Sequence, residues 1–132
     1  MSKLEAFLKK NKRTQEEFEV NLQSFDEPVK MRIVSGEEYQ DIQKSSFITV
    51  RKGRKTEKEL DPMKFNRQLV MASIAHPPLT NTELQQAYDA TGETELYNKM
   101  FNWAEQSLLL EALMEQSGFD QDINDEVEEA KN

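Results

Sequence analysis

Apolar and charged residues alternate in two short runs near the start of the chain, and this is the period of a half-buried β-strand. The runs cover residues 17–22 and 29–34, and the turn-forming segment Ser24–Pro28 separates them. We therefore predict an antiparallel hairpin. On its solvated face, two acidic residues should lie opposite two basic residues, namely Glu17 and Glu19 opposite Lys30 and Arg32.

Three further elements are predicted before residue 61. Apolar residues at helical spacing predict a short amphipathic helix over residues 2–11. The segment Ser35–Glu38 matches a capping box, in which the serine hydroxyl and the glutamate carboxylate both bind backbone N–H groups, so a helix should cover residues 36–45. Residues Phe47–Arg51 have high strand propensity and are predicted to add a third strand. The basic segment 51–58 that follows is predicted to be a loop.

From residue 61 onward the apolar residues recur with a period of 3.6, which predicts a helical second half. Asp61 and Pro62 are typical of a helix start, because aspartate accepts backbone N–H groups and proline needs no donor at the first helical position. We expect this helix to end before Pro77. His76, the only histidine, would then be a C-terminal residue near the helix dipole, since no second ligand lies at metal spacing in the sequence.

Three helices are expected to follow, and the third is longer than the short helix before it. The capping box Thr80–Glu83 predicts one helix from about residue 82. A short helix through residues 96–101 should come next. A long helix is then predicted from about Trp103 to Ser117, because the following Gly118 can take the left-handed conformation that ends a helix.

The long helix has an unusually broad apolar surface. Its apolar residues cover an arc of about 240°, whereas a surface helix needs roughly 100°. The helix is therefore either buried on two sides or exposes one side to a partner protein. The side that we consider for a partner carries Trp103, Leu110 and Met114, which lie together at about 100° per residue.

Composition is that of one domain with a modest core. The chain has 132 residues, of which 36% are apolar and 32% charged. We predict an α+β fold: a small antiparallel three-stranded sheet with short helices in residues 1–60, a helical half in residues 61–119, and an acidic C-terminal segment in residues 120–132. All of residues 1–132 are expected to form a single domain. The lack of cysteine and of a membrane-length apolar run predicts a cytoplasmic protein.

Charge is unevenly distributed. The net charge is −8, yet residues 67–132 contain only 3 basic residues against 13 acidic ones. An acidic surface repels phosphate, so we expect no nucleic-acid partner for that half. The basic segment, with Arg51, Lys52, Arg54 and Lys55, has two interpretations: a phosphate contact or a solvated connection. No aromatic residue interleaves its charges, as a single-strand binding platform would require.

No motif for catalysis, a cofactor or a metal is present. The sequence lacks a glycine-rich phosphate loop, a nucleophile elbow and zinc-ligand spacing. The segment from Asp120 resembles a calcium loop, but Asp125 replaces the required glycine and Lys131 the bidentate glutamate. We therefore expect no enzymatic activity, no cofactor and no metal site.

Taken along its length, the chain resembles the XkdN-like tail assembly chaperones of phages and prophages of Gram-positive bacteria. The segments that carry the resemblance are short and span nearly the whole chain. They are Leu4–Asn11, Ile33–Tyr39, Leu69–Pro78, Leu79–Tyr88, Gly118–Asp120 and Val127–Asn132.

The resemblance implies a non-enzymatic chaperone in the bacterial cytoplasm. Such a protein is expected to bind the long helical tape-measure protein of the tail and to keep it soluble while tube subunits assemble around it. An amphipathic groove would suit that partner, and methionines would make its lining adaptable. The residues considered for the partner surface are Trp103, Leu110, Met114, Met100 and Met71, with Met63 as a further methionine of the lining.

Two alternatives remain open, and so does self-association. The first is a structural protein of the tail or its joining region that stays in the virion. The second is a small enzyme or regulator that uses the basic segment.

Overall fold

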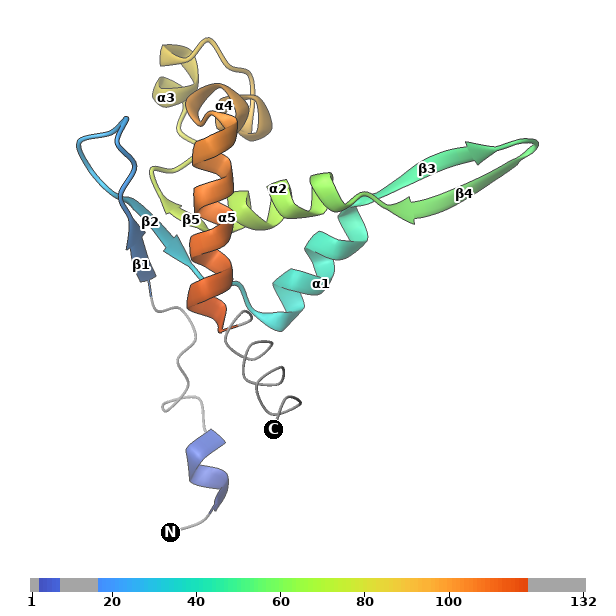
Figure 1. The fold of residues 1–132 in the computed structure, drawn as a ribbon, viewed down its shortest axis with the longest axis horizontal. Coiled ribbons are helices and arrows are strands. Elements are labelled where there is room, and N and C mark those ends of the chain that lie inside the picture. The colour runs from blue at the N-terminus through green and yellow to red at the C-terminus, as the bar shows by residue number, and fades with distance from the viewer. Residues whose placement is uncertain (1–2, 8–16, 119–132) are drawn as a thin grey trace, which may run out of the picture.

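The computed structural model describes residues 3–7 and 17–118 and confirms the α+β fold (Figure 1). The 3-10 helix η1 lies within the helix predicted for residues 2–11, the rest of which, like segment 120–132, falls outside the described residues. The elements are η1 (Lys3–Phe7), β1 (Glu17–Val20), β2 (Val29–Arg32), α1 (Gly36–Ser45), β3 (Phe47–Lys52), β4 (Lys55–Leu60), α2 (Pro62–Ser73), β5 (Ile74–His76), α3 (Thr82–Ala87), α4 (Glu93–Met100) and α5 (Trp103–Ser117).

The predicted N-terminal hairpin is confirmed, including its register. Strands β1 and β2 are antiparallel, with Glu17 opposite Arg32 and Glu19 opposite Lys30. The Arg32 guanidinium nevertheless donates to both carboxylate oxygens of Glu38 in α1, at 3.0 and 2.8 Å. The Glu38 carboxylate is therefore occupied by Arg32, and the capping box of α1 is only half formed, through the hydrogen bond from the Glu38 N–H to Ser35.

Phe47–Arg51 was predicted to be the third strand of this sheet, and this prediction is wrong. The third strand is β5. The strand order is β1-β2-β5, and Met31 of β2 pairs with Ile74 of β5. Both of these residues are buried, so the sheet gains its third strand from the segment that follows a core helix. Since α2 ends at Ser73, His76 lies in an exposed strand end and not at a helix C-terminus as predicted.

Strands β3 and β4 form a separate two-stranded hairpin that projects from the body beside α1 and α2 (Figure 1). The predicted basic loop is thus mostly strand, with a tight turn at Gly53, whose φ of +65° suits glycine. The pairing is local, so its loop-closure entropy is small and the strand propensity of Phe47–Arg51 is satisfied by its sequence neighbour. Lys52 forms ion pairs with Glu57 and Glu59 on one face of this hairpin.

The start of α2 and the bounds of α5 were predicted correctly from the sequence. The Asp61 carboxylate accepts the N–H groups of Met63 and Lys64 at the start of α2, as expected. Helix α5 has the predicted bounds and ends at Gly118, whose φ is +82°. Helix α3 starts as predicted at residue 82, but its cap is Asn81 and not the expected Thr80.

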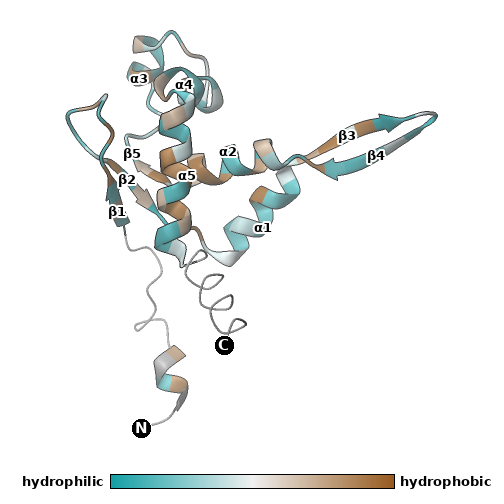
Figure 2. Cartoon of the chain, viewed as in Figure 1, coloured by the Kyte–Doolittle hydropathy of each residue, from teal (hydrophilic) through white to brown (hydrophobic). Residues whose placement is uncertain are grey.

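The core lies between the three-stranded sheet and helices α2, α4 and α5. Of the broad apolar surface of α5, the side with Leu109 and Leu113 is buried. Figure 2 shows that apolar residues also occur on the projecting β3 strand. The buried apolar residues of the described chain are Leu22, Val29, Met31, Leu69, Val70, Ile74, Leu79, Leu96, Tyr97, Phe101, Leu109 and Leu113.

Candidate partner-binding surface

The structure distributes the five predicted partner residues over different parts of the surface. Met71 lines a hollow beside α1 and β5, and Met100 lines a second one beside the β1–β2 turn. Trp103 and Leu110 line a third hollow between α2 and α5. Met114 is half-buried on α5 and lines none of the three. Only Trp103 and Leu110 are therefore brought together in one hollow.

The third hollow is a groove of about 270 Å³ between two helices, and we call it the α2–α5 groove. Helical spacing explains why it forms, since residues three and four apart lie on one face of a helix. On α2 this face carries Met63, Arg67 and Val70, and on α5 it carries Trp103, Gln106 and Leu110. The residues that line the groove are Met63, Asn66, Arg67, Val70, Tyr97, Trp103, Gln106, Ser107 and Leu110.

The two most exposed apolar side chains of α2 and α5 flank this groove. Met63 is 80% exposed and Trp103 is 82% exposed, whereas Val70 and Tyr97 in the same groove are buried. Trp103 is the first residue of α5, outside the face that carries Leu109 and Leu113 into the core. Large apolar groups held in water next to a hollow are typical of a surface that binds another protein.

A positive charge lies in the groove without a counterion. Among the described residues, no carboxylate oxygen lies within 4.0 Å of Arg67, and its Nε is buried with no hydrogen-bond partner. Burial raises the pKa of the Tyr97 hydroxyl to about 12, and the charge of Arg67 opposes this shift. The groove therefore combines apolar walls with one unpaired guanidinium.

Sequence reasoning placed Met63 on an apolar stripe but overlooked Arg67. A signal was available: Arg67 is one of only three basic residues in residues 67–132, and it lies one helical turn after Met63. What the sequence could not reveal is that α5 crosses that turn of α2.

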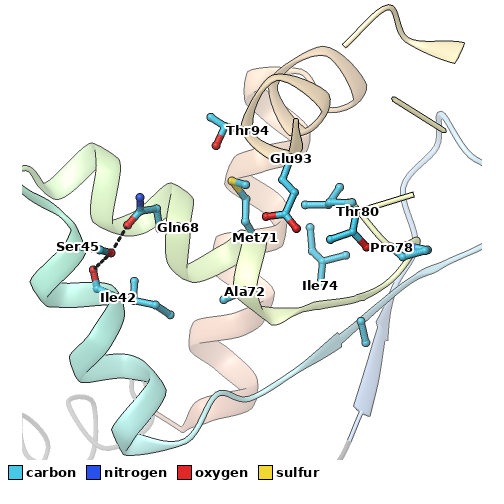
Figure 3. Close-up of a pocket in the computed structure, with 12 residues that line it drawn as sticks. Ile42, Ser45, Gln68, Met71, Ala72, Ile74, Pro78, Thr80, Glu93 and Thr94 are labelled. Atoms are coloured by element: carbon cyan, nitrogen blue, oxygen red, sulfur yellow. Dashed lines mark hydrogen bonds between the residues drawn. The ribbon is translucent and has the colours of Figure 1, made fainter. Parts of the chain in front are cut away.

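The first hollow, of about 500 Å³, lies between α1, α2, β5 and the start of α4 (Figure 3). Two of its polar residues bind each other, since the Gln68 amide oxygen accepts from the Ser45 hydroxyl at 2.8 Å. The same oxygen accepts from the hydroxyl of the neighbouring Ser46 at 3.0 Å. The Ser45 hydroxyl is thus paired with an amide and with the Ile42 carbonyl, and not with a base that could activate it. This arrangement gives no support for nucleophilic catalysis.

The second hollow, of about 370 Å³, contains both His76 and Met100. Asp26 and Glu27 line it as well. Within residues 3–7 and 17–118, no three histidine or acidic side chains are grouped as ligands for a metal ion. In the same part of the chain, no helix has the length and apolar character to cross a membrane.

Two comparisons with known proteins give matches. A family model described as phage XkdN-like tail assembly chaperone protein matches residues 4–131. A crystal structure of the protein YqbN is similar in fold, with a TM-score of 0.66 over 89% of this chain and 98% of that chain, at 17% sequence identity. A search of curated protein sequences gives no match.

Proposed function

This chain belongs to the XkdN-like family of phage tail assembly chaperones, and from that premise we propose that it binds the tape-measure protein of the tail. In this proposal it keeps the tape-measure protein soluble in the bacterial cytoplasm while tube subunits assemble around it. Binding is its whole activity, and no reaction is involved. The family itself supports a protein partner in tail assembly and a non-enzymatic role.

The observation that carries the proposal is the pair of exposed apolar side chains, Met63 and Trp103, on one groove between two helices. An amphipathic helix binds such a groove by laying its apolar stripe between the two walls. Burial of a large apolar side chain is favourable by about 1.5–3 kcal/mol relative to exposure. Covering Met63 and Trp103 therefore gives a partner helix a strong local anchor.

The partner should contact this groove in short, similar segments. A tape-measure protein is expected to present long helices, and a methionine at the rim adapts to different side chains because its thioether chain is unbranched. The net charge of −8 keeps the complex soluble, since like-charged complexes repel each other. Met71 and Met100 lie outside the groove, in the other two hollows, and are therefore not part of this proposed contact.

The test is co-expression with the tape-measure protein of the same phage, followed by pull-down and a sedimentation assay of solubility. The wild type should co-purify with the tape-measure protein and keep it in the supernatant. Trp103→Glu and Met63→Glu should abolish both effects while the protein stays folded. Leu108→Glu is the matched control, because Leu108 is 49% exposed on α5 but does not line the groove.

Two results would contradict the proposal. The first is a tape-measure protein that stays insoluble and unbound with the wild type. The second is the presence of this protein in purified virions at the copy number of a structural subunit, which would establish the structural alternative. Quantitative mass spectrometry of purified particles measures that copy number.

A further inference from the structure

We propose that Arg67 makes the α2–α5 groove selective for a helix that carries a carboxylate within its apolar stripe. The identity of the natural partner rests on the proposed function, whereas the chemistry of the groove follows from its own residues. The occupant is thus an amphipathic helix with one glutamate or aspartate among leucine-like side chains.

The first step is that Arg67 lacks the carboxylate partner that the partly exposed Arg32 has. Arg32 donates two hydrogen bonds to Glu38, at 3.0 and 2.8 Å, in the paired geometry that suits guanidinium and carboxylate. Arg67 has no such carboxylate among the described residues, and its Nε is both buried and unpartnered. The terminal nitrogens of Arg67 form no ion pair within the described residues, so they remain available for a carboxylate that comes from outside.

The second step concerns the surroundings of this guanidinium. Val70 and Tyr97 beside it are buried, and Met63 and Trp103 flank it on the two helices. When a helix covers the groove, water leaves and the remaining donors of Arg67 lose their solvent partners. A purely apolar stripe would then leave a buried charge unpaired, whereas a carboxylate in the stripe would satisfy it.

The third step is that the helical half of the chain is acidic. Residues 67–132 have 13 acidic residues against 3 basic ones, of which Arg67 is one. A carboxylate at most positions of a docked helix would face a negative field and be unfavourable. A carboxylate opposite Arg67 is attracted instead, so the groove responds to where the acidic residue lies in the helix and not only to how acidic the helix is.

The test uses two designed helical peptides of 18 residues, labelled with fluorescein. Both have a leucine stripe, and they differ only at its centre, where one has Glu and the other Gln. Their dissociation constants are measured by fluorescence anisotropy with the full chain and with Arg67→Met, which keeps an unbranched apolar stem in the same place. Emission of Trp103, the only tryptophan, reports whether the groove is the site.

We expect the Glu peptide to bind the wild type about tenfold more tightly than the Gln peptide, since a charged hydrogen bond contributes on this scale. With Arg67→Met the two peptides should bind equally. Trp103 emission should shift to the blue when either peptide covers it.

Equal affinities for the wild type would overturn the proposal without any concern about folding, because the change is then in the peptide alone. Failure of both peptides to bind would overturn the groove as a helix site. A wild-type dimer that Arg67→Met dissociates would show that the carboxylate comes from a second copy, which also contradicts a partner helix. The tape-measure co-purification is a separate measurement, so a failure of the proposed function is distinguishable from each of these results.

Discussion

The two sides of helix α5 should respond in opposite ways to substitution, and Trp103 and Leu109 test this directly. Leu109 is fully buried and Trp103 is 82% exposed, although they lie on the same helix. Truncation of a fully buried leucine to alanine lowers the free energy of unfolding by about 2–5 kcal/mol. Substitution of an exposed side chain away from special features changes it by about 0.5 kcal/mol or less.

Side-chain size alone would predict that Trp103→Ala lowers the free energy of unfolding more than Leu109→Ala does. A buried tryptophan replaced by alanine would lower the free energy of unfolding by about 3–5 kcal/mol. We therefore expect Leu109→Ala to be destabilised by at least about 1.5 kcal/mol relative to Trp103→Ala. Urea denaturation followed by circular dichroism measures both values, provided that the slopes of the transitions are equal for the two variants.

Affinity for the partner helix should be lowered more by Trp103→Ala than by Leu109→Ala. If Trp103 is a main anchor for the partner helix, its truncation weakens binding by about 2 kcal/mol, or roughly 30-fold. Leu109→Ala, measured where it is still folded, should keep the wild-type affinity within a few-fold. A Trp103→Ala variant that loses more than about 2 kcal/mol of stability would show that this side chain belongs to the core. The partner surface would then have to be sought elsewhere.

Three further predictions concern caps, turns and one ion pair. Asn102→Ala removes the side-chain acceptor that binds the Glu105 N–H at the start of α5, so a loss of about 1 kcal/mol in urea denaturation is expected. Gly53→Ala should destabilise the β3–β4 hairpin by about 1 kcal/mol, since φ is +65° there and the added methyl group meets no other atom; faster hydrogen exchange confined to β3 and β4 would show it. Arg32 lowers the pKa of Glu38 by hydrogen bonding. The contribution of this ion pair to the free energy of unfolding is therefore complete at neutral pH and is lost as the pH falls through the lowered pKa. Wild type should exceed Glu38→Gln by about 0.5–1 kcal/mol at pH 7, after allowance for solvent screening, and the two should converge in acid.

The local signals in the sequence determined the starts and ends of the main helices. Asp61 and Pro62 begin α2, and Gly118 ends α5, because each acts on backbone groups within a few residues of itself. The β1–β2 register was equally predictable, since a one-residue slip would exchange the buried and solvated faces of both strands. These features depend on chain neighbours, and the sequence specifies them without knowledge of the rest of the fold.

Strand pairing beyond sequence neighbours was decided by the tertiary structure. Strand propensity marked Phe47–Arg51 as a strand but did not identify its partner, and the local pairing with β4 left the third place in the sheet to β5. The short segment Ile74–His76 carries no strand pattern of its own. It forms a strand because α2 packs beside the sheet and places Ile74 opposite Met31.

The candidate site divides in the same way. The sequence identified Trp103 and Leu110 as neighbours on one helix face, because their spacing alone places them there. It did not identify Arg67, and it grouped Met71 and Met100 with residues that they do not approach. Periodicity specifies which residues share a face of one helix. Which face of α2 meets which face of α5 is decided only when the core around Leu109 and Val70 packs, and that packing places a guanidinium between Met63 and Trp103.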